Sequence, residues 1–150
     1  MGGLRGQLLY FAYGADLRRE ALMRRCPGAD WLGLASLEGH RFVMGAHGVA
    51  TVRAEEKATV WGALWLVSAE QLETLDELAG VAEGRSERTT RRIISPAGPR
   101  TEAMMYVSPP AVAGVKNTAG YMMDVLEGAR ENRFPAAYIK ELQSWAKAEG

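Results

Sequence analysis

Residues 8–17, Leu-Leu-Tyr-Phe-Ala-Tyr-Gly-Ala-Asp-Leu, join an uncharged apolar run to a glycine and a helix start. The run at 8–12 lacks the alternation of a half-exposed strand, so it predicts a strand that is buried on both faces. Gly14 interrupts the run. Asp16 then stands where the N-cap of a helix over about 17–25 is expected.

The turn between this strand and this helix, residues 13–17, predicts a small anion site. Several backbone N–H groups meet where a strand turns into a helix, and the helix dipole favours negative charge at that point. We therefore expect the turn, Tyr13-Gly14-Ala15-Asp16-Leu17, to bind a carboxylate or a phosphate.

The remaining sequence alternates strand patterns with helix patterns. Residues 59–67 are apolar on both faces and predict a central strand, in which Gly62 indicates a bulge or a close approach of another backbone. Ser68 and Gln71 form a capping box, and Gly80 is expected to end the helix that follows. Further strands are expected at 31–36, 41–44, 49–53, 88–95 and 102–107, with turns at 37–40 and 54–57.

The helix after Ser68 carries an apolar stripe of Leu72, Leu75 and Leu78. Two more helices are expected, one over about 120–132 that Thr118 would cap, and one that starts at Pro135. No repeat or linker divides the sequence, so we expect a single domain over residues 1–150. The predicted fold class is α+β, a small mixed β-barrel-like sheet with surrounding helices.

Composition argues against several classes of function. Eighteen basic and eighteen acidic residues give zero formal net charge, so no overall field attracts nucleic acid or an anionic membrane. Cys26 is the single cysteine and there are two histidines, so we expect no disulfide and no metal site. No apolar stretch reaches the ~20 residues of a membrane span, and the N-terminus has no cleavage pattern. We expect a cytoplasmic protein.

Five segments occur in an order and at a spacing that together resemble one family. They are Tyr10-Phe-Ala-Tyr-Gly-Ala-Asp-Leu17, Gly48-Val-Ala-Thr-Val52, Val60-Trp-Gly62, Leu75-Asp-Glu-Leu-Ala-Gly-Val81 and Gly128-Ala-Arg-Glu-Asn-Arg-Phe-Pro-Ala-Ala-Tyr138. This set is similar to the γ-glutamylcyclotransferase-like proteins, also called the AIG2-like family.

The resemblance implies a small barrel-like sheet with helices around it, and a reaction on a γ-glutamyl amide. The substrate's own α-amine attacks its γ-carbonyl, which releases 5-oxoproline and the free amine, with no cofactor or metal. Such chemistry needs a carboxylate base, a hold on the α-carboxylate and donors for the oxyanion. Tyr106 and Tyr121 match tyrosines that line the family's pocket. The alternative for each is a core tyrosine whose hydroxyl is already satisfied.

The sequence departs from the family at the implied site. The catalytic glutamate of the family falls at Ala79, and a methyl group cannot accept a proton. In the family a tyrosine usually follows this glutamate by a few residues, and here it is replaced near Ser86. In the turn, Ala15 and Asp16 stand where the family has serine and asparagine.

These departures leave three interpretations open. The first is an enzyme of the family's kind whose base has moved to Asp16 or Glu83. The second is a binding or regulatory protein that keeps the pocket for a γ-glutamyl amine or another amino-acid-like ligand without the chemistry. The third is an enzyme with a different substrate on the same scaffold.

Overall fold

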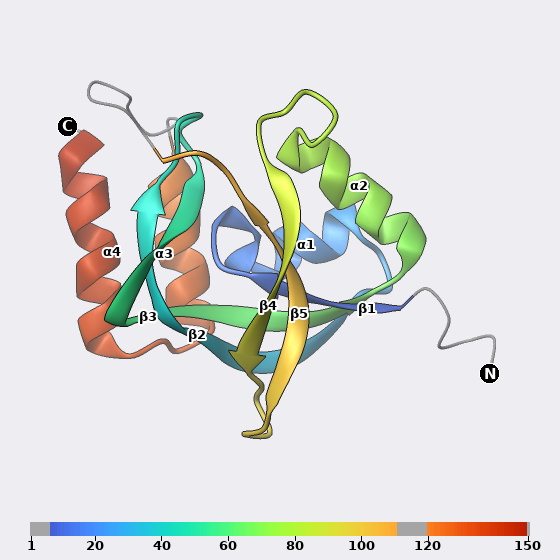
Figure 1. Cartoon of the computed structure of the whole chain (residues 1–150), viewed down its shortest axis with the longest axis horizontal. Coiled ribbons are helices and arrows are strands. Elements are labelled where there is room, and N and C mark those ends of the chain that lie inside the picture. The colour runs from blue at the N-terminus through green and yellow to red at the C-terminus, as the bar shows by residue number, and fades with distance from the viewer. Residues whose placement is uncertain (1–6, 111–119, 150) are drawn as a thin grey trace.

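Five strands close into a barrel in the part of the chain that the computed structural model describes, residues 7–110 and 120–149 (Figure 1). The strand order is β1-β3-β2-β4-β5, and β1 lies antiparallel to β3 but parallel to β5. The mixed barrel with outer helices confirms the predicted fold class. The elements are β1 (Leu8–Ala12), the 3₁₀ turn η2 (Ala15–Leu17), α1 (Arg19–Arg25), β2 (Asp30–Met44), β3 (Ala50–Val67), α2 (Ala69–Ala79), β4 (Glu87–Ile94), β5 (Arg100–Val107), α3 (Tyr121–Glu131) and α4 (Ala136–Glu149).

β2 and β3 form one long hairpin, and the predicted turns at 37–40 and 54–57 are wrong. Both segments continue as strand, with a shift in the pairing register between Glu38 and His40. Gly39 between them has φ of 75°, a conformation that lets a strand bulge and then continue. The glycine and the nearby charges therefore mark a bulge rather than a chain reversal.

The core fills the barrel and the space beneath the helices. The strand predicted at 8–12 is buried from Tyr10 onward, whereas Leu8 is 40% exposed at its start. Gly62 has the close backbone approach that was expected, because a Cβ there would lie 2.5 Å from the carbonyl oxygen of Ala12. The largest fully buried side chains include Trp65, Phe11, Phe42, Leu17 and Leu22.

Helix α2 begins and ends as predicted. Gln71 N donates to Ser68 Oγ at 3.1 Å, and Ser68 N donates to Gln71 Oε1 at 2.8 Å, which completes the capping box. Gly80 ends the helix in the left-handed conformation, with φ of 73°. The predicted stripe is buried at Leu72 and Leu75, but Leu78 is 49% exposed.

The prediction that Asp16 caps the first helix is wrong. Residues 15–17 form a separate 3₁₀ turn, and α1 starts only at Arg19, with Arg18 at the N-cap position. The Asp16 carboxylate instead accepts hydrogen bonds from Tyr10 and Arg25, so it is held by side chains rather than by helix amides. At α3 the N-cap is Gly120, and Thr118 lies outside the described residues.

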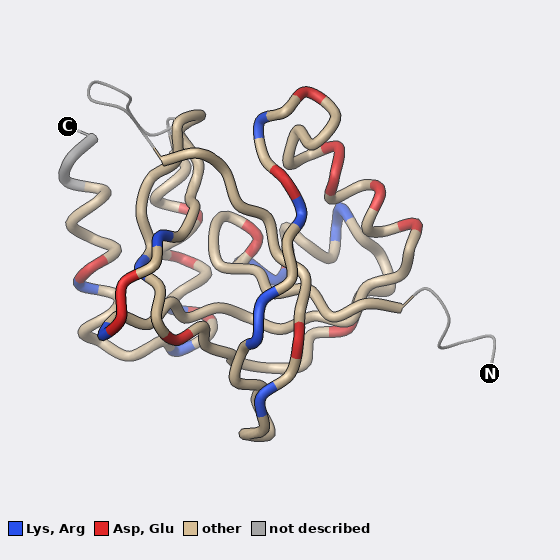
Figure 2. The backbone as a smooth tube through the Cα atoms, in the orientation of Figure 1, with Lys and Arg blue, Asp and Glu red and all other residues tan. Residues whose placement is uncertain are grey.

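Charges are distributed unevenly over the surface. Acidic residues gather along α2, and basic residues follow β4 beside it (Figure 2). Asp76 and Arg88 connect the two elements through an ion pair of 2.7 Å. None of the described helices combines the length and the apolar character needed to cross a membrane.

Candidate active site

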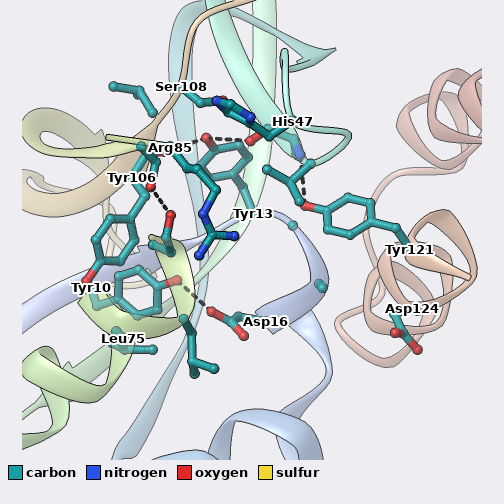
Figure 3. A pocket seen from close by; sticks show the side chains of 18 of the residues that line it. Tyr10, Tyr13, Asp16, His47, Leu75, Arg85, Tyr106, Ser108, Tyr121 and Asp124 are labelled. Atoms are coloured by element: carbon teal, nitrogen blue, oxygen red, sulfur yellow. Dashed lines mark hydrogen bonds between the residues drawn. The ribbon is translucent and has the colours of Figure 1, made fainter. Parts of the chain in front are cut away.

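A cavity of about 380 Å³ opens where the end of β1 meets α2, β5 and the start of α3 (Figure 3). This volume suits a small molecule. Seven of the nine site residues predicted from the sequence line it: Tyr13, Gly14, Ala15, Asp16, Ala79, Tyr106 and Tyr121. Leu17 is fully buried in the core instead, and Glu83 is not part of the lining.

The Tyr13–Leu17 turn forms one wall of the cavity. Leu17 N donates to Gly14 O at 3.1 Å, which closes the turn. Gly14 has no room for a side chain, because a Cβ there would overlap the hydroxyl of Tyr121. The turn therefore presents backbone rather than side chain to the cavity at this point, as close contact with a ligand requires.

Asp16 places a carboxylate at the edge of the same turn. Its side chain is 20% exposed, and its two oxygens accept from Tyr10 Oη and from Arg25 Nη1, each at 2.9 Å. Burial raises the pKa of this carboxyl, and the opposing effects of Tyr10 and Arg25 do not cancel the increase. A carboxylate with a raised pKa is a stronger proton acceptor than a fully solvated one.

Asp124 is the second acidic residue among the described lining residues. It is at the rim of the cavity on α3, with a side chain 47% exposed, and it pairs with Arg18 at 3.0 Å. Asp16 is therefore the more enclosed of the two carboxylates.

The end of α2 forms the wall that carries Ala79. Ser86 Oγ donates to the carbonyl oxygen of Ala79 at 2.6 Å. The Arg85 side chain crosses directly over Gly80 and lines the cavity, while Glu83 pairs with it at 3.1 Å. The Glu83 side chain is 59% exposed, so its carboxylate lies on the solvent side of that pair.

Three of the four tyrosines that line the cavity donate a hydrogen bond from their hydroxyl to another group of the protein. Tyr10 donates to Asp16, Tyr13 donates to the carbonyl oxygen of Tyr106 at 2.6 Å, and Tyr106 donates to Asp76 at 2.6 Å. Burial, followed by the Asp76 hydrogen bond, raises the pKa of Tyr106. The rings of Tyr10 and Tyr106 meet edge to face at 5.9 Å.

Tyr121 differs because its hydroxyl oxygen receives a hydrogen bond. Ala50 N donates to it at 2.9 Å, and the Ala15 backbone also lowers its pKa by hydrogen bonding. Burial is nevertheless the largest influence and raises the pKa of Tyr121 to about 12, so the hydroxyl keeps its proton at neutral pH. The Tyr121 hydroxyl can therefore donate this proton to a ligand.

Sequence reasoning did not assign to the site six charged or polar residues that line the cavity: Tyr10, Arg25, His47, Arg85, Ser108 and Asp124. In the sequence Tyr10 belongs to the predicted buried strand and to the first family segment, and its proximity to Asp16 depends on how the chain turns at Gly14. The two arginines lie among many surface arginines in the sequence, and no spacing distinguishes them. Within the described residues, no three His, Cys, Asp or Glu side chains are grouped to hold a metal ion.

The barrel and its turn-side cavity define a class of protein, the γ-glutamylcyclotransferase-like fold. A solved structure of a gamma-glutamyl cyclotransferase has a TM-score of 0.82 and 26% identity, covering 91% of this chain and 86% of that chain. The model of the AIG2-like family matches residues 59–142, and the chain belongs to that family. The gamma-glutamylcyclotransferases of Homo sapiens and Bos taurus are 26% and 27% identical over 91% of this chain and 77% of their own length.

Proposed function

We propose that this protein cleaves a γ-glutamyl amide into 5-oxoproline and a free amine, with Asp16 as the general base. The observation that carries the proposal is the enclosed Asp16 carboxylate, which lies on the Tyr13–Leu17 turn and has a raised pKa. The similarity to relatives named gamma-glutamylcyclotransferase supports the class of reaction.

In this mechanism the turn amides hold the substrate's α-carboxylate, which folds the α-amine back toward the γ-carbonyl. Asp16 accepts a proton from the α-ammonium, and the free amine attacks the γ-carbonyl carbon. The new C–N bond closes the five-membered ring, while the original amide C–N bond breaks. As the ring closes, the attacking nitrogen releases a second proton and becomes the lactam N–H. The departing amine takes up this proton and the one that Asp16 had accepted and leaves as an ammonium ion, so no water is consumed.

Tyr121 is suited to stabilise the oxyanion in this reaction. Its hydroxyl keeps its proton at neutral pH and receives a backbone N–H, an arrangement that orients the remaining O–H. A donor that is already in place when charge develops lowers the barrier without reorganisation.

A second candidate function is a binding protein without turnover. In its favour, Ala79 lines the cavity at the position where the family resemblance implies the catalytic glutamate, and the Arg85 cation lies against the neighbouring Gly80. A cavity with a cation and turn amides but no working base would bind a carboxylate ligand and release it unchanged.

Ala79→Glu separates the two functions. If Asp16 is the base, we expect this substitution to lower turnover by up to about tenfold, because a second carboxylate in the cavity repels the α-carboxylate of the substrate. Formation of 5-oxoproline from a series of γ-glutamyl amides, followed by chromatography, measures the effect, with Ala79→Gln as the neutral control. A wild-type protein without turnover that gains it through Ala79→Glu would establish the binding function.

Glu83→Gln tests the remaining candidate base. The Glu83 carboxylate pairs with Arg85 on the solvent side, so we expect turnover to stay within about twofold of wild type, as for most surface substitutions. Steady-state rates on the same γ-glutamyl amides provide the measurement. A loss of a hundredfold or more would assign the base to Glu83 and contradict the assignment to Asp16.

A further inference from the structure

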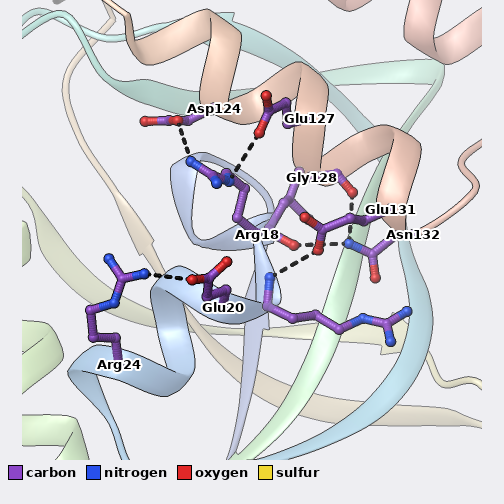
Figure 4. A network of polar contacts seen from close by, with 10 residues as sticks. Arg18, Glu20, Arg24, Asp124, Glu127, Gly128, Glu131 and Asn132 are labelled. Atoms are coloured by element: carbon purple, nitrogen blue, oxygen red, sulfur yellow. Dashed lines mark hydrogen bonds and ion pairs between the residues drawn. The ribbon is translucent and has the colours of Figure 1, made fainter.

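Helix α3 contacts the segment that follows the Tyr13–Leu17 turn, and Asn132 at its C-terminal end is central to this contact (Figure 4). Asn132 is only 3% exposed. Its Nδ2 donates to Leu17 O at 2.9 Å and to Gly128 O at 2.8 Å, and its Oδ1 accepts from Trp31 Nε1 at 3.2 Å. Both donors and the acceptor of the side chain amide are therefore used inside the protein.

Gly128 brings the backbone of the turn against the helix. A Cβ at this position would lie 2.7 Å from the carbonyl carbon of Leu17 and 2.9 Å from Arg18 N. The peptide unit between Leu17 and Arg18 therefore packs directly on α3, and the Asn132 amide fixes the direction of its carbonyl.

The other end of α3 reaches the other end of the turn. Tyr121, the first residue of the helix, places its hydroxyl against Gly14 and accepts from Ala50 N. Tyr121 and Asn132 are about 16 Å apart along the helix axis at 1.5 Å per residue. Because the helix is rigid over this length, a displacement at Leu17 would also displace the Tyr121 hydroxyl from the cavity.

Charged contacts add to this connection but are more exposed. Arg18 pairs with Asp124 at 3.0 Å and with Glu127 at 3.2 Å, with side chains 33%, 47% and 54% exposed. Exposed ion pairs contribute little to geometry or stability, whereas the buried amide of Asn132 has no competing water.

We propose that Asn132 is a positioning residue for the candidate active site. Through Leu17 O it fixes the backbone of the carboxylate-binding turn, and through α3 it keeps the Tyr121 hydroxyl in the cavity. This inference rests on the proposed function, because it assigns Asn132 to the same carboxylate and oxyanion contacts. Asn132 touches no ligand itself and is absent from the cavity lining.

Asn132→Ala removes the amide without adding a charge. We expect the affinity for 5-oxoproline and for glutamate to fall by at least about tenfold, the effect of losing correct orientation at a ligand site. We also expect the backbone amide resonances of residues 14–17 to shift in the ligand-free protein. Titration calorimetry and two-dimensional NMR, both at a temperature well below unfolding, measure these effects.

Two control variants separate positioning from stability. Trp31→Phe removes the partner of Asn132 Oδ1 but leaves the bond to Leu17 O, so ligand affinity should stay within about twofold of wild type. Leu142→Ala destabilises the fully buried core on α4 away from the turn, and it should lower the melting temperature without changing affinity.

The results distinguish this inference from the proposed function. Wild-type affinity in Asn132→Ala, with unchanged resonances at residues 14–17, would overturn the positioning role, as would an equal loss of affinity in Leu142→Ala. Should Asn132→Ala fail to fold, Asn132→Ser is measured in the same way. A wild-type protein that binds neither ligand would overturn the proposed function, while the amide resonances would still decide whether Asn132 positions the turn.

Discussion

Asp16→Asn is expected to reduce the turnover of γ-glutamyl amides by about 10²–10⁴-fold, the usual effect of removing a general base. The amide preserves the size of the side chain but cannot accept the ammonium proton. Because burial raises the pKa of the Asp16 carboxyl, turnover of the wild type should fall on the acid side as this group takes up a proton. The residual turnover of the variant should not show this decrease at acid pH. Rates of 5-oxoproline formation across the pH range measure both effects.

The stability of the same variant provides the control. A raised folded-state pKa means that the favourable contribution of the Asp16 carboxyl to stability is present below its unfolded pKa of about 3.9, and is lost as pH rises through the folded value. The melting temperature of Asp16→Asn relative to that of wild type should therefore rise from pH 4 to pH 7, because only the wild type loses this contribution. A much lower melting temperature at pH 7 would attribute the lost turnover to unfolding instead.

Tyr121→Phe is expected to reduce turnover by about 10²–10³-fold, the effect of removing one oxyanion donor. The ring would still fill its half-buried position, so the KM should change much less than the kcat. Steady-state kinetics on a γ-glutamyl amide separates the two parameters. An increase in KM alone would show that Tyr121 stabilises the bound substrate and the transition state equally and does not act on the chemical step.

Tyr106→Phe is the matched control for this prediction. Tyr106 also lines the cavity, but its hydroxyl donates to Asp76, so its removal should lower turnover by less than about tenfold. Equal losses in the two phenylalanine variants would contradict the assignment of the oxyanion to Tyr121 and would indicate a general disturbance of the tyrosine cluster.

The sequence predicted much of the fold because several of its signals are local. The capping box at Ser68 and the glycine end at Gly80 depend on a few neighbouring residues, and both predictions are confirmed. The continuous hairpin of β2 and β3 could not be predicted in the same way. Glycine and charged residues are typical of turns, and only pairing with a distant strand shows that Gly39 forms a bulge.

The candidate site was predictable in position but not in its interactions. The strand, glycine and acidic residue at 8–17 indicated the turn, and this turn does line the cavity. The local pattern made Asp16 a helix cap, whereas tertiary contacts with Tyr10 and Arg25 determine where its carboxylate points. Glu83 was a candidate through its sequence distance from Ala79, but its pairing with Arg85 depends on the path of the loop.

The packing of Gly128 against Leu17 has a consequence for how this protein tolerates mutation. A glycine inside a helix costs about 1 kcal/mol relative to alanine, so alanine would be the better residue for α3 in isolation. The close backbone of Leu17 reverses that preference, because even a methyl group would collide with it. A mutational survey limited to residues that touch the ligand would therefore omit Gly128, a position outside the cavity where substitution should be among the most damaging.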